Sequence, residues 1–400
     1  MKLAGRVLAT VIILGLPIYY WRFTVMGLPT NLTELASLLL LILTIATLIS
    51  ERRRPVFPLW LPTSLLIGAL LLGTWGAPDR QVALGIVKGW FIIPAVFYWA
   101  VVQLFDRQHY RWLVGALVVG SLGVAAYALL QQAGLIGLLG YQQVGGNLQQ
   151  YLDQHRALAF FESPNYLAMF LVPTAALTFW LGRGQYRWLG LAVAAGLTLV
   201  VVLTGSRSGL IALALGTLII ALIRIERLSI RFGVSLLTVL VIAGVLFLLP
   251  RSAGIDNERL YIWREAWSYY RLHPVWGIGP GAFQSYFQQY GSRDPAIYRA
   301  VLPYALHPHN LYLTLLLSGG PLALASFGWI VVELGRRATR VIRGDRYLRA
   351  LLAGGLVILI QGLFDTTYFK NDLALIFWLL AAGIILLTEN SDSEATDERV

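Results

Sequence analysis

Long apolar segments recur along almost the entire chain, and they limit what it can fold into more than any other feature. Each is close to the roughly 20 residues that a helix needs to cross the hydrocarbon core of a membrane. Only 13% of the residues are charged, against roughly 25% in a water-soluble domain. The sequence therefore predicts an all-α, polytopic transmembrane helix bundle over residues 1–388. About twelve spans are expected, near residues 7–21, 33–50, 56–74, 82–103, 112–131, 164–182, 186–204, 208–223, 232–249, 311–332, 350–364 and 373–388.

The distribution of Lys and Arg predicts how these spans are oriented. With the N-terminus in the cytoplasm, 19 of the 31 Lys and Arg residues fall on that side, six fall in or beside short connections on the other, and six more lie in one long outer loop. Cytoplasmic connections are enriched in Lys and Arg, so both termini are expected in the cytoplasm. The acidic residues 389–400 are expected to form a disordered cytoplasmic tail.

Two outer connections, residues 132–163 and 250–310, are far longer than the rest. Connections of that length are usually functional or disordered. The second is rich in Trp, Tyr and Phe, so it is predicted to be a folded, partly helical extracytoplasmic loop. The chain has no cysteine, which excludes disulfides, thiolate metal sites and a cysteine nucleophile.

An arginine follows small residues in the outer connection 204–209, which reads Thr-Gly-Ser-Arg-Ser-Gly. Small residues expose backbone N–H groups, and Arg207 beside them could bind a phosphate at the membrane surface, with Ser206 in support. Alternatively, Arg207 reaches the lipid headgroups without a more specific role. The residues alone leave both interpretations open.

Residues 258–272 are predicted to form a helix that ends before His273-Pro274. At roughly 100° per residue, Arg259 shares a face with Trp263, whereas Arg264 points well away from it. This helix could lie on the membrane with Arg259 stacked on Trp263, or it could hold the Arg259 guanidinium for a lipid-borne anion. Both interpretations are kept.

Two short motifs follow that helix. Residues 277–281, Gly-Ile-Gly-Pro-Gly, come after a helix rather than a strand, so they are interpreted as a turn and not as a nucleotide-binding loop. In His307-Pro308-His309-Asn310, His309 could act as a general base because imidazole titrates near neutral pH. Alternatively, Asn310 caps a helix and His309 is an ordinary interfacial residue. No DxD, HExxH or Cys ligand set accompanies the histidines, so no metal site is predicted.

Four segments in this order resemble the bacterial O-antigen ligase and O-antigen polymerase superfamily of polytopic membrane glycosyltransferases. The likeness covers roughly residues 150–330. One departure from the ligase pattern is that Gly320 is followed by Ala323 where a second glycine is usual. The four segments are Phe160-Phe161-Glu162-Ser163-Pro164-Asn165, Thr204-Gly205-Ser206-Arg207-Ser208-Gly209, Arg259 with Trp263 and Pro274 through Phe283, and His309-Asn310-Leu311-Tyr312-Leu313 followed by Ser318-Gly319-Gly320.

The resemblance implies transfer of a glycan from a polyprenyl (undecaprenyl) diphosphate carrier to an acceptor hydroxyl, at the outer face of the bacterial cytoplasmic (inner) membrane. It also implies that Arg207 and Arg259 hold the diphosphate and that His309 activates the acceptor. Arg156 lies on the same side and could assist in binding the diphosphate, and Asn310, Ser206, Arg264 and His307 are possible supporting residues. Because paired arginines can neutralise a diphosphate leaving group, we expect a metal-independent, inverting reaction that needs no cofactor.

Three functions remain as alternatives at this point. The first is an O-antigen ligase of lipopolysaccharide biosynthesis, and the second is a polysaccharide polymerase of the same superfamily. The third is a twelve-span secondary transporter, although spans nearly free of mid-membrane charge count against it. The expected partners are a polyprenyl-diphosphate-linked glycan donor, a lipid or glycan acceptor, and membrane lipids, but no nucleic acid. Arg259 and Arg264 both remain candidates for the loop arginine that contacts diphosphate.

Overall fold

The fold was analysed in a computed structural model of the chain. It describes residues 1–18, 22–25, 28–139, 148–182, 186–248, 255–291, 298, 302, 305–342 and 344–397. Parts of both long outer connections, including residues 140–147, 249–254 and 292–297, therefore lie outside the described residues.

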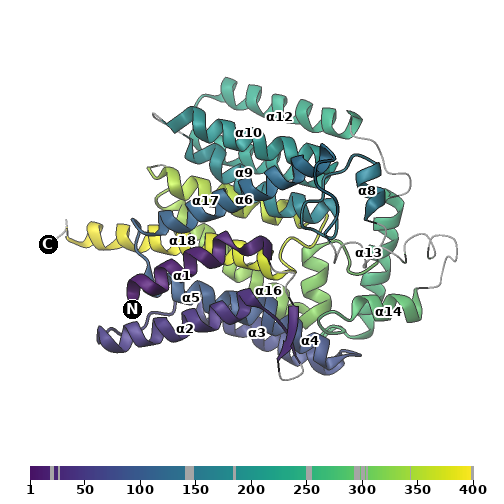
Figure 1. Ribbon diagram of the computed structural model, residues 1–400, viewed down its shortest axis with the longest axis horizontal. Helices are drawn as coiled ribbons and strands as arrows, with labels where there is room; N and C mark the ends of the chain where they lie inside the picture. The colour runs from purple at the N-terminus through teal and green to yellow at the C-terminus, as the bar shows by residue number, and fades with distance from the viewer. Residues whose placement is uncertain are drawn as a thin grey trace.

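Long helices packed side by side make up most of the described residues (Figure 1). One short antiparallel hairpin pairs β1 with β2 near the N-terminus. The elements are α1 (Lys2–Leu14), η1 (Leu16–Ile18), β1 (Arg22–Val25), β2 (Leu28–Asn31), α2 (Leu32–Ser50), α3 (Trp60–Gly73), η2 (Thr74–Gly76), α4 (Arg80–Val87), the π-helical turn η3 (Lys88–Ile92), α5 (Ile93–Leu104), α6 (Tyr110–Gln132), α8 (Gln149–Asp153), α9 (Pro164–Leu181), α10 (Arg187–Thr204), α11 (Arg207–Arg224), α12 (Leu228–Leu248), α13 (Ile255–Leu272), α14 (Phe283–Tyr290), α16 (Leu311–Thr339), α17 (Arg346–Gln361) and α18 (Asn371–Asp397).

The predicted all-α polytopic class is confirmed. Each of the twelve predicted segments falls on a helix, and seven helices among the described residues are long and apolar enough to cross a membrane. They are Leu32–Ser50, Arg80–Leu104, Tyr110–Gln132, Pro164–Leu181, Arg187–Thr204, Leu311–Thr339 and Asn371–Glu389. The total of about twelve spans stays a prediction, because the remaining apolar helices are shorter. For example, α1 ends at Leu14, and the 3₁₀ turn that follows it contains Pro17.

Polar side chains fix where several helices begin. Asn31, Ser163, Ser206 and Asn310 each accept a hydrogen bond from a backbone N–H in the first turn of the helix that follows. Such caps satisfy N–H groups that have no partner within the helix, and each contributes about 1 kcal/mol. Asn310 therefore is the helix cap that the sequence suggested, and it sets the start of α16 directly after His309.

A break divides α16 into two pieces. Gly319 and Gly320 have non-helical backbone angles, and Gly320 has a φ of 68°. The backbone N–H groups of Ile278 and Gly279 donate to the Leu317 carbonyl at the end of the first piece, over 2.8 and 3.1 Å. Residues 277–281 thus form the expected turn, whose amides satisfy a carbonyl that the break would otherwise leave without a partner.

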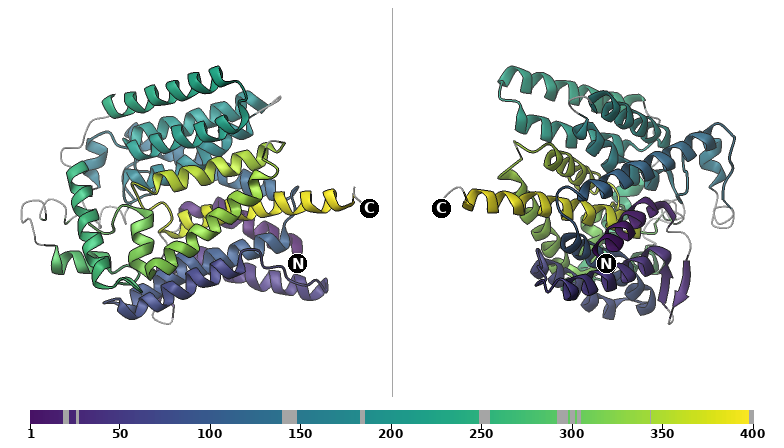
Figure 2. Two further views of the ribbon diagram at one scale, coloured as in Figure 1. Left: turned by 180° about the vertical axis from the view of Figure 1, so that it is seen from behind. Right: turned by 60° about the vertical axis from the view of Figure 1, so that its left-hand side comes forward.

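The outer connections gather at one end of the bundle. Figures 1 and 2 show α8, α13 and α14 together at the end opposite to the two chain termini. α13 runs across the direction of the long helices rather than along it, as both figures show. At the other end, α18 continues to Asp397 and includes most of the tail predicted to be disordered, because no Gly or Pro follows Thr388 to stop the helix.

A polar network holds the start of α18 in place. Lys88, in the π-helical turn, forms a 2.8 Å ion pair with Glu34 of α2. The Asn371 side-chain amide donates to Glu34 Oε1 over 3.0 Å and accepts from the Trp90 indole N–H over 3.1 Å. Gly89 leaves room for this contact, because a Cβ atom there would lie 2.7 Å from Glu34 Oε1 and would displace the carboxylate. The network fixes the segment before α18, which carries the residues described next.

Candidate active site at the end of the bundle opposite to the termini

His309 lies between the proline of its motif and the first residue of α16, in an unusual backbone conformation. Its φ is 49°, in the left-handed region that non-glycine residues rarely adopt. Holding a residue there costs on the order of 1–3 kcal/mol, and such strain concentrates at functional sites. Tertiary contacts therefore determine where this imidazole points, and the catalytic role of His309 stays a prediction.

Asp365 is the main contact of the His309 side chain. It lies in the connection between α17 and α18, and its Oδ1 is 3.4 Å from His309 Nδ1. The carboxyl is 1% exposed, whereas the His309 side chain is 19% exposed. A proton on Nδ1 that is donated to Asp365 places the lone pair on Nε2. The pair has the arrangement by which a carboxylate orients a histidine base and stabilises its protonated form.

His307 contacts the other side of the same imidazole. The ring centroids of His307 and His309 are 4.2 Å apart, and His307 Nδ1 accepts a 3.3 Å hydrogen bond from the His309 backbone N–H. Because Nδ1 accepts, the proton of the neutral ring is on Nε2, which is 3.1 Å from the Tyr166 hydroxyl. His307 is therefore a neutral part of the cluster, and its supporting role stays a prediction.

The surroundings of the cluster keep His307 neutral and Asp365 ionised. Burial lowers the pKa of His307 to about 3, and the neighbouring His309 acts in the same direction, so His307 stays neutral at physiological pH. Burial of the Asp365 carboxyl raises its pKa, but the His309 hydrogen bond and the charges of His309 and Arg259 outweigh this effect and hold the pKa well below its usual range. Asp365 is therefore ionised. It supplies the negative charge that His309 would need in order to act as a base.

Arg259 of α13 points into this cluster. Its guanidinium NH2 lies 4.0 Å from Asp365 Oδ2, and its side chain is 21% exposed. The neighbouring Trp263 donates its indole N–H to the Pro308 carbonyl over 3.0 Å, which ties α13 to the histidine motif. The structure thus brings Arg259 and His309 to one site. Arg264 is exposed on a different face of α13, so Arg259 is the loop arginine that faces the cluster.

Arg207 follows the turn between α10 and α11, and Arg156, from the connection between α8 and α9, contacts that turn. Arg207 is the half-buried first residue of α11, directly after the cap Ser206. Arg156 Nε donates to the Thr204 carbonyl over 2.9 Å and packs beside Gly205, which has a φ of 68°. Ser206 and Arg156 therefore shape the turn that carries Arg207. Whether the three arginines bind one diphosphate stays a prediction.

Three residues of the site were not among the predicted site residues. Asp365 and Lys370 lie in the connection before α18, and Tyr166 lies in the first turn of α9. Lys370 Nζ is 4.1 Å from the Tyr166 ring centroid and 3.4 Å from Glu162 Oε2. The only signal in the sequence was a pair of charged residues in a short outer connection, and nothing local relates them to His309, 56 positions away.

A divalent metal could use part of the same cluster. His307, His309 and Asp365 offer ligand atoms that lie within 4.8 Å of one another, a set that no local motif had indicated. A cation there would take one ligand atom from each of these residues, and Asp365 would have to bind it while remaining 4.0 Å from the Arg259 guanidinium. The hydrogen bonds and the arginine favour direct use of the histidines, and metal independence stays a prediction.

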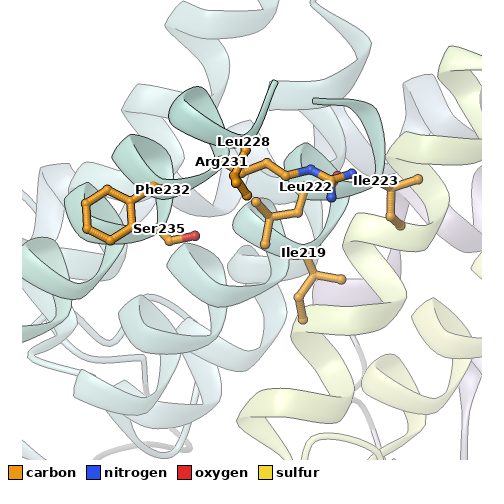
Figure 3. Close-up of a pocket in the computed structure, with 7 residues that line it drawn as sticks. All are labelled: Ile219, Leu222, Ile223, Leu228, Arg231, Phe232 and Ser235. Carbon is orange, nitrogen blue, oxygen red and sulfur yellow. The ribbon is translucent and has the colours of Figure 1, made fainter. Parts of the chain in front are cut away.

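An open groove lies between the end of α11 and the start of α12, away from this cluster. Figure 3 shows its apolar side chains around Arg231, and its volume is about 570 Å³. The α11 residues that line this groove, Ile219, Leu222 and Ile223, lie about 18–24 Å along the helix from Arg207. Arg231 donates to the Leu222 and Ile225 carbonyls, which cap the end of α11. The groove is thus apolar surface with a structural arginine.

Comparison with known families supplies independent evidence. Residues 191–328 match the family described as O-Antigen ligase. The match contains Arg207, Arg259 and His309, whereas Asp365 and Tyr166 lie outside it. It confirms the resemblance to the O-antigen ligase and polymerase superfamily and supports a membrane enzyme of that type. No curated protein matches the chain.

Proposed function

We propose that this protein transfers a glycan from a polyprenyl diphosphate carrier to an acceptor hydroxyl at the outer face of the bacterial cytoplasmic membrane. The observation that carries the proposal is His309, held in a left-handed conformation against ionised Asp365 beside Arg259. The O-antigen ligase match over residues 191–328 supports the class of reaction. Carrier, acceptor and orientation are parts of the proposal.

The transfer would be a single displacement at the anomeric carbon. His309 Nε2 takes the proton of the acceptor hydroxyl as the hydroxyl oxygen forms a bond to C1 of the glycan. The bond from C1 to the diphosphate oxygen breaks, and polyprenyl diphosphate leaves with the electron pair. Attack opposite to the leaving group inverts the anomeric configuration. Asp365 stabilises the imidazolium that forms, as an orienting carboxylate does in other histidine-base enzymes.

The arginines would serve the leaving group. A diphosphate takes up negative charge as the C1–O bond breaks, and guanidinium groups bind phosphate oxygens through two parallel N–H donors. Arg259 and Arg207 are the proposed donors, and Arg156 would hold the turn of Arg207. Because Asp365 contacts both His309 and Arg259, one carboxylate would set the position of base and leaving-group ligand together.

Two measurements test this proposal. In purified protein with a polyprenyl-diphosphate glycan, His309→Ala should lower single-turnover transfer by roughly 10²–10⁴-fold, the usual contribution of a positioned base, and should leave donor binding intact. Transfer at the wild-type rate in folded His309→Ala protein would refute the role of His309. Mass analysis of cells lacking the protein then separates the two family functions. Full-length glycan that accumulates on the carrier indicates a ligase, whereas single repeats indicate a polymerase.

A further inference from the structure

The outward side of α13 carries an open groove that the transfer mechanism does not use. Its volume is about 410 Å³. In a helical projection of α13 with Arg259 at 0°, the groove residues lie at about 40–140°. They therefore form one continuous face next to Arg259. The residues that line it are Leu260, Trp263, Arg264, Trp267 and Arg271.

Aromatic and cationic side chains combine in this groove. Trp267 is 48% exposed and Leu260 is 51% exposed, so both side chains are open to a ligand. Arg264 and Arg271 are also exposed, and among the residues that the structure describes neither has an ion pair with a carboxylate. The face therefore offers a flat apolar indole beside two guanidinium groups that are available to an anion.

Trp263 joins the groove to the proposed active site. It lines the groove, and its indole N–H is held by the Pro308 carbonyl, one residue before His309. A chain molecule whose end lies at Arg259 and His309 could continue across Trp263 onto Trp267 without crossing a buried surface. The buried face of α13, with Ile262, Ala266 and Tyr269, lies on the other side of Arg259.

We infer that this groove binds an anionic glycan segment, with sugar carboxylates or phosphates on Arg264 and Arg271 and a sugar ring on Trp267. The inference rests on the proposed transfer reaction, because it names the class of glycan that the reaction would use. The C–H face of a pyranose ring is apolar and fits an exposed indole, while Arg binds carboxylate in a planar, two-bond geometry. A neutral glycan would make no ion pair with either guanidinium group.

The test measures binding of a free oligosaccharide. Wild-type protein in phosphatidylcholine nanodiscs is titrated with a hexamer of galacturonic acid and, for comparison, with neutral maltohexaose. The double variant Arg264→Gln/Arg271→Gln and the variant Trp267→Ala should each bind the acidic hexamer at least tenfold more weakly. Arg80→Gln and Trp75→Ala are matched controls at exposed positions of the outer connection 74–80, and they should bind like the wild type.

Each contrary result has a definite meaning. Equal affinity for both hexamers, or no loss in the groove variants, would overturn the inference. If phosphatidylglycerol in the nanodisc displaces the acidic hexamer completely, the groove belongs to the membrane surface and the inference is also wrong. His309→Ala should still bind the hexamer, because binding needs no transfer. Wild-type protein that binds the hexamer but transfers no glycan would refute the proposed function alone.

Discussion

Replacing Asp365 by Asn tests whether the buried carboxylate supports a base at His309. The two side chains have nearly the same shape, so the change removes the negative charge 3.4 Å from His309 Nδ1 and, with it, the 4.0 Å ion pair with Arg259. At an effective dielectric constant of about 20, two unit charges at that separation interact by about 5 kcal/mol. The partly exposed His309 reduces this value, and about 2–4 kcal/mol is expected to remain.

That energy predicts a definite loss of rate. Each 1.36 kcal/mol corresponds to a tenfold change in rate, so Asp365→Asn should lower turnover by roughly 30- to 1,000-fold. Single-turnover transfer from a polyprenyl-diphosphate glycan, with donor binding measured in parallel, separates turnover from binding. Asp79→Asn is the matched control, since Asp79 is an exposed helix cap on the same side and Asn caps equally well. Transfer within threefold of the wild type, in folded Asp365→Asn protein, would refute the reasoning.

The remaining predictions concern the arginines, His307, topology and metal. Arg259→Lys and Arg207→Lys should each weaken donor binding, measured by titration, because Lys keeps the charge but loses the planar two-bond geometry. His307→Asn should reduce the loss of thermal stability between pH 7 and pH 5, because the wild-type ring is neutral when folded but takes up a proton when unfolded below about pH 6.5. That difference corresponds to roughly 2 kcal/mol at pH 5. A cysteine at Ser285 should react with an impermeant maleimide from outside the membrane, and one at Ser50 only after lysis. Transfer should survive EDTA, because arginines can neutralise the diphosphate.

Each of these predictions has a result that would contradict it. Arg→Lys variants with unchanged donor binding would remove the arginines from the diphosphate site. A stability profile of His307→Asn that matches the wild type would mean that His307 is not kept neutral by the fold. Labelling of the Ser285 cysteine only after lysis would reverse the orientation. A rate lost in EDTA and restored by Mg²⁺ or Mn²⁺ would assign His307, His309 and Asp365 to a metal.

The sequence was sufficient for the class of the fold and for the order of its helices. Hydrocarbon cannot hydrogen-bond to a peptide group, so apolar segments of about 20 residues have to form helices with all their backbone groups paired internally. Two local features could also be predicted, the cap of α16 by Asn310 and the turn at residues 277–281. Both depend on interactions within or near their own segments. Arg259 and Arg264 could be separated because a helix has a fixed angle per residue.

Only the tertiary structure decided which side chains meet. Asp365, Tyr166 and Lys370 come from connections and helices far from His309 in the chain, and no spacing rule relates them to it. His307 gained its neutral state from burial and from the backbone of His309. The apolar pattern of a span specifies a helix but not its neighbours. The cluster forms because the start of α16, the α17–α18 connection and α13 are packed together at one end of the bundle.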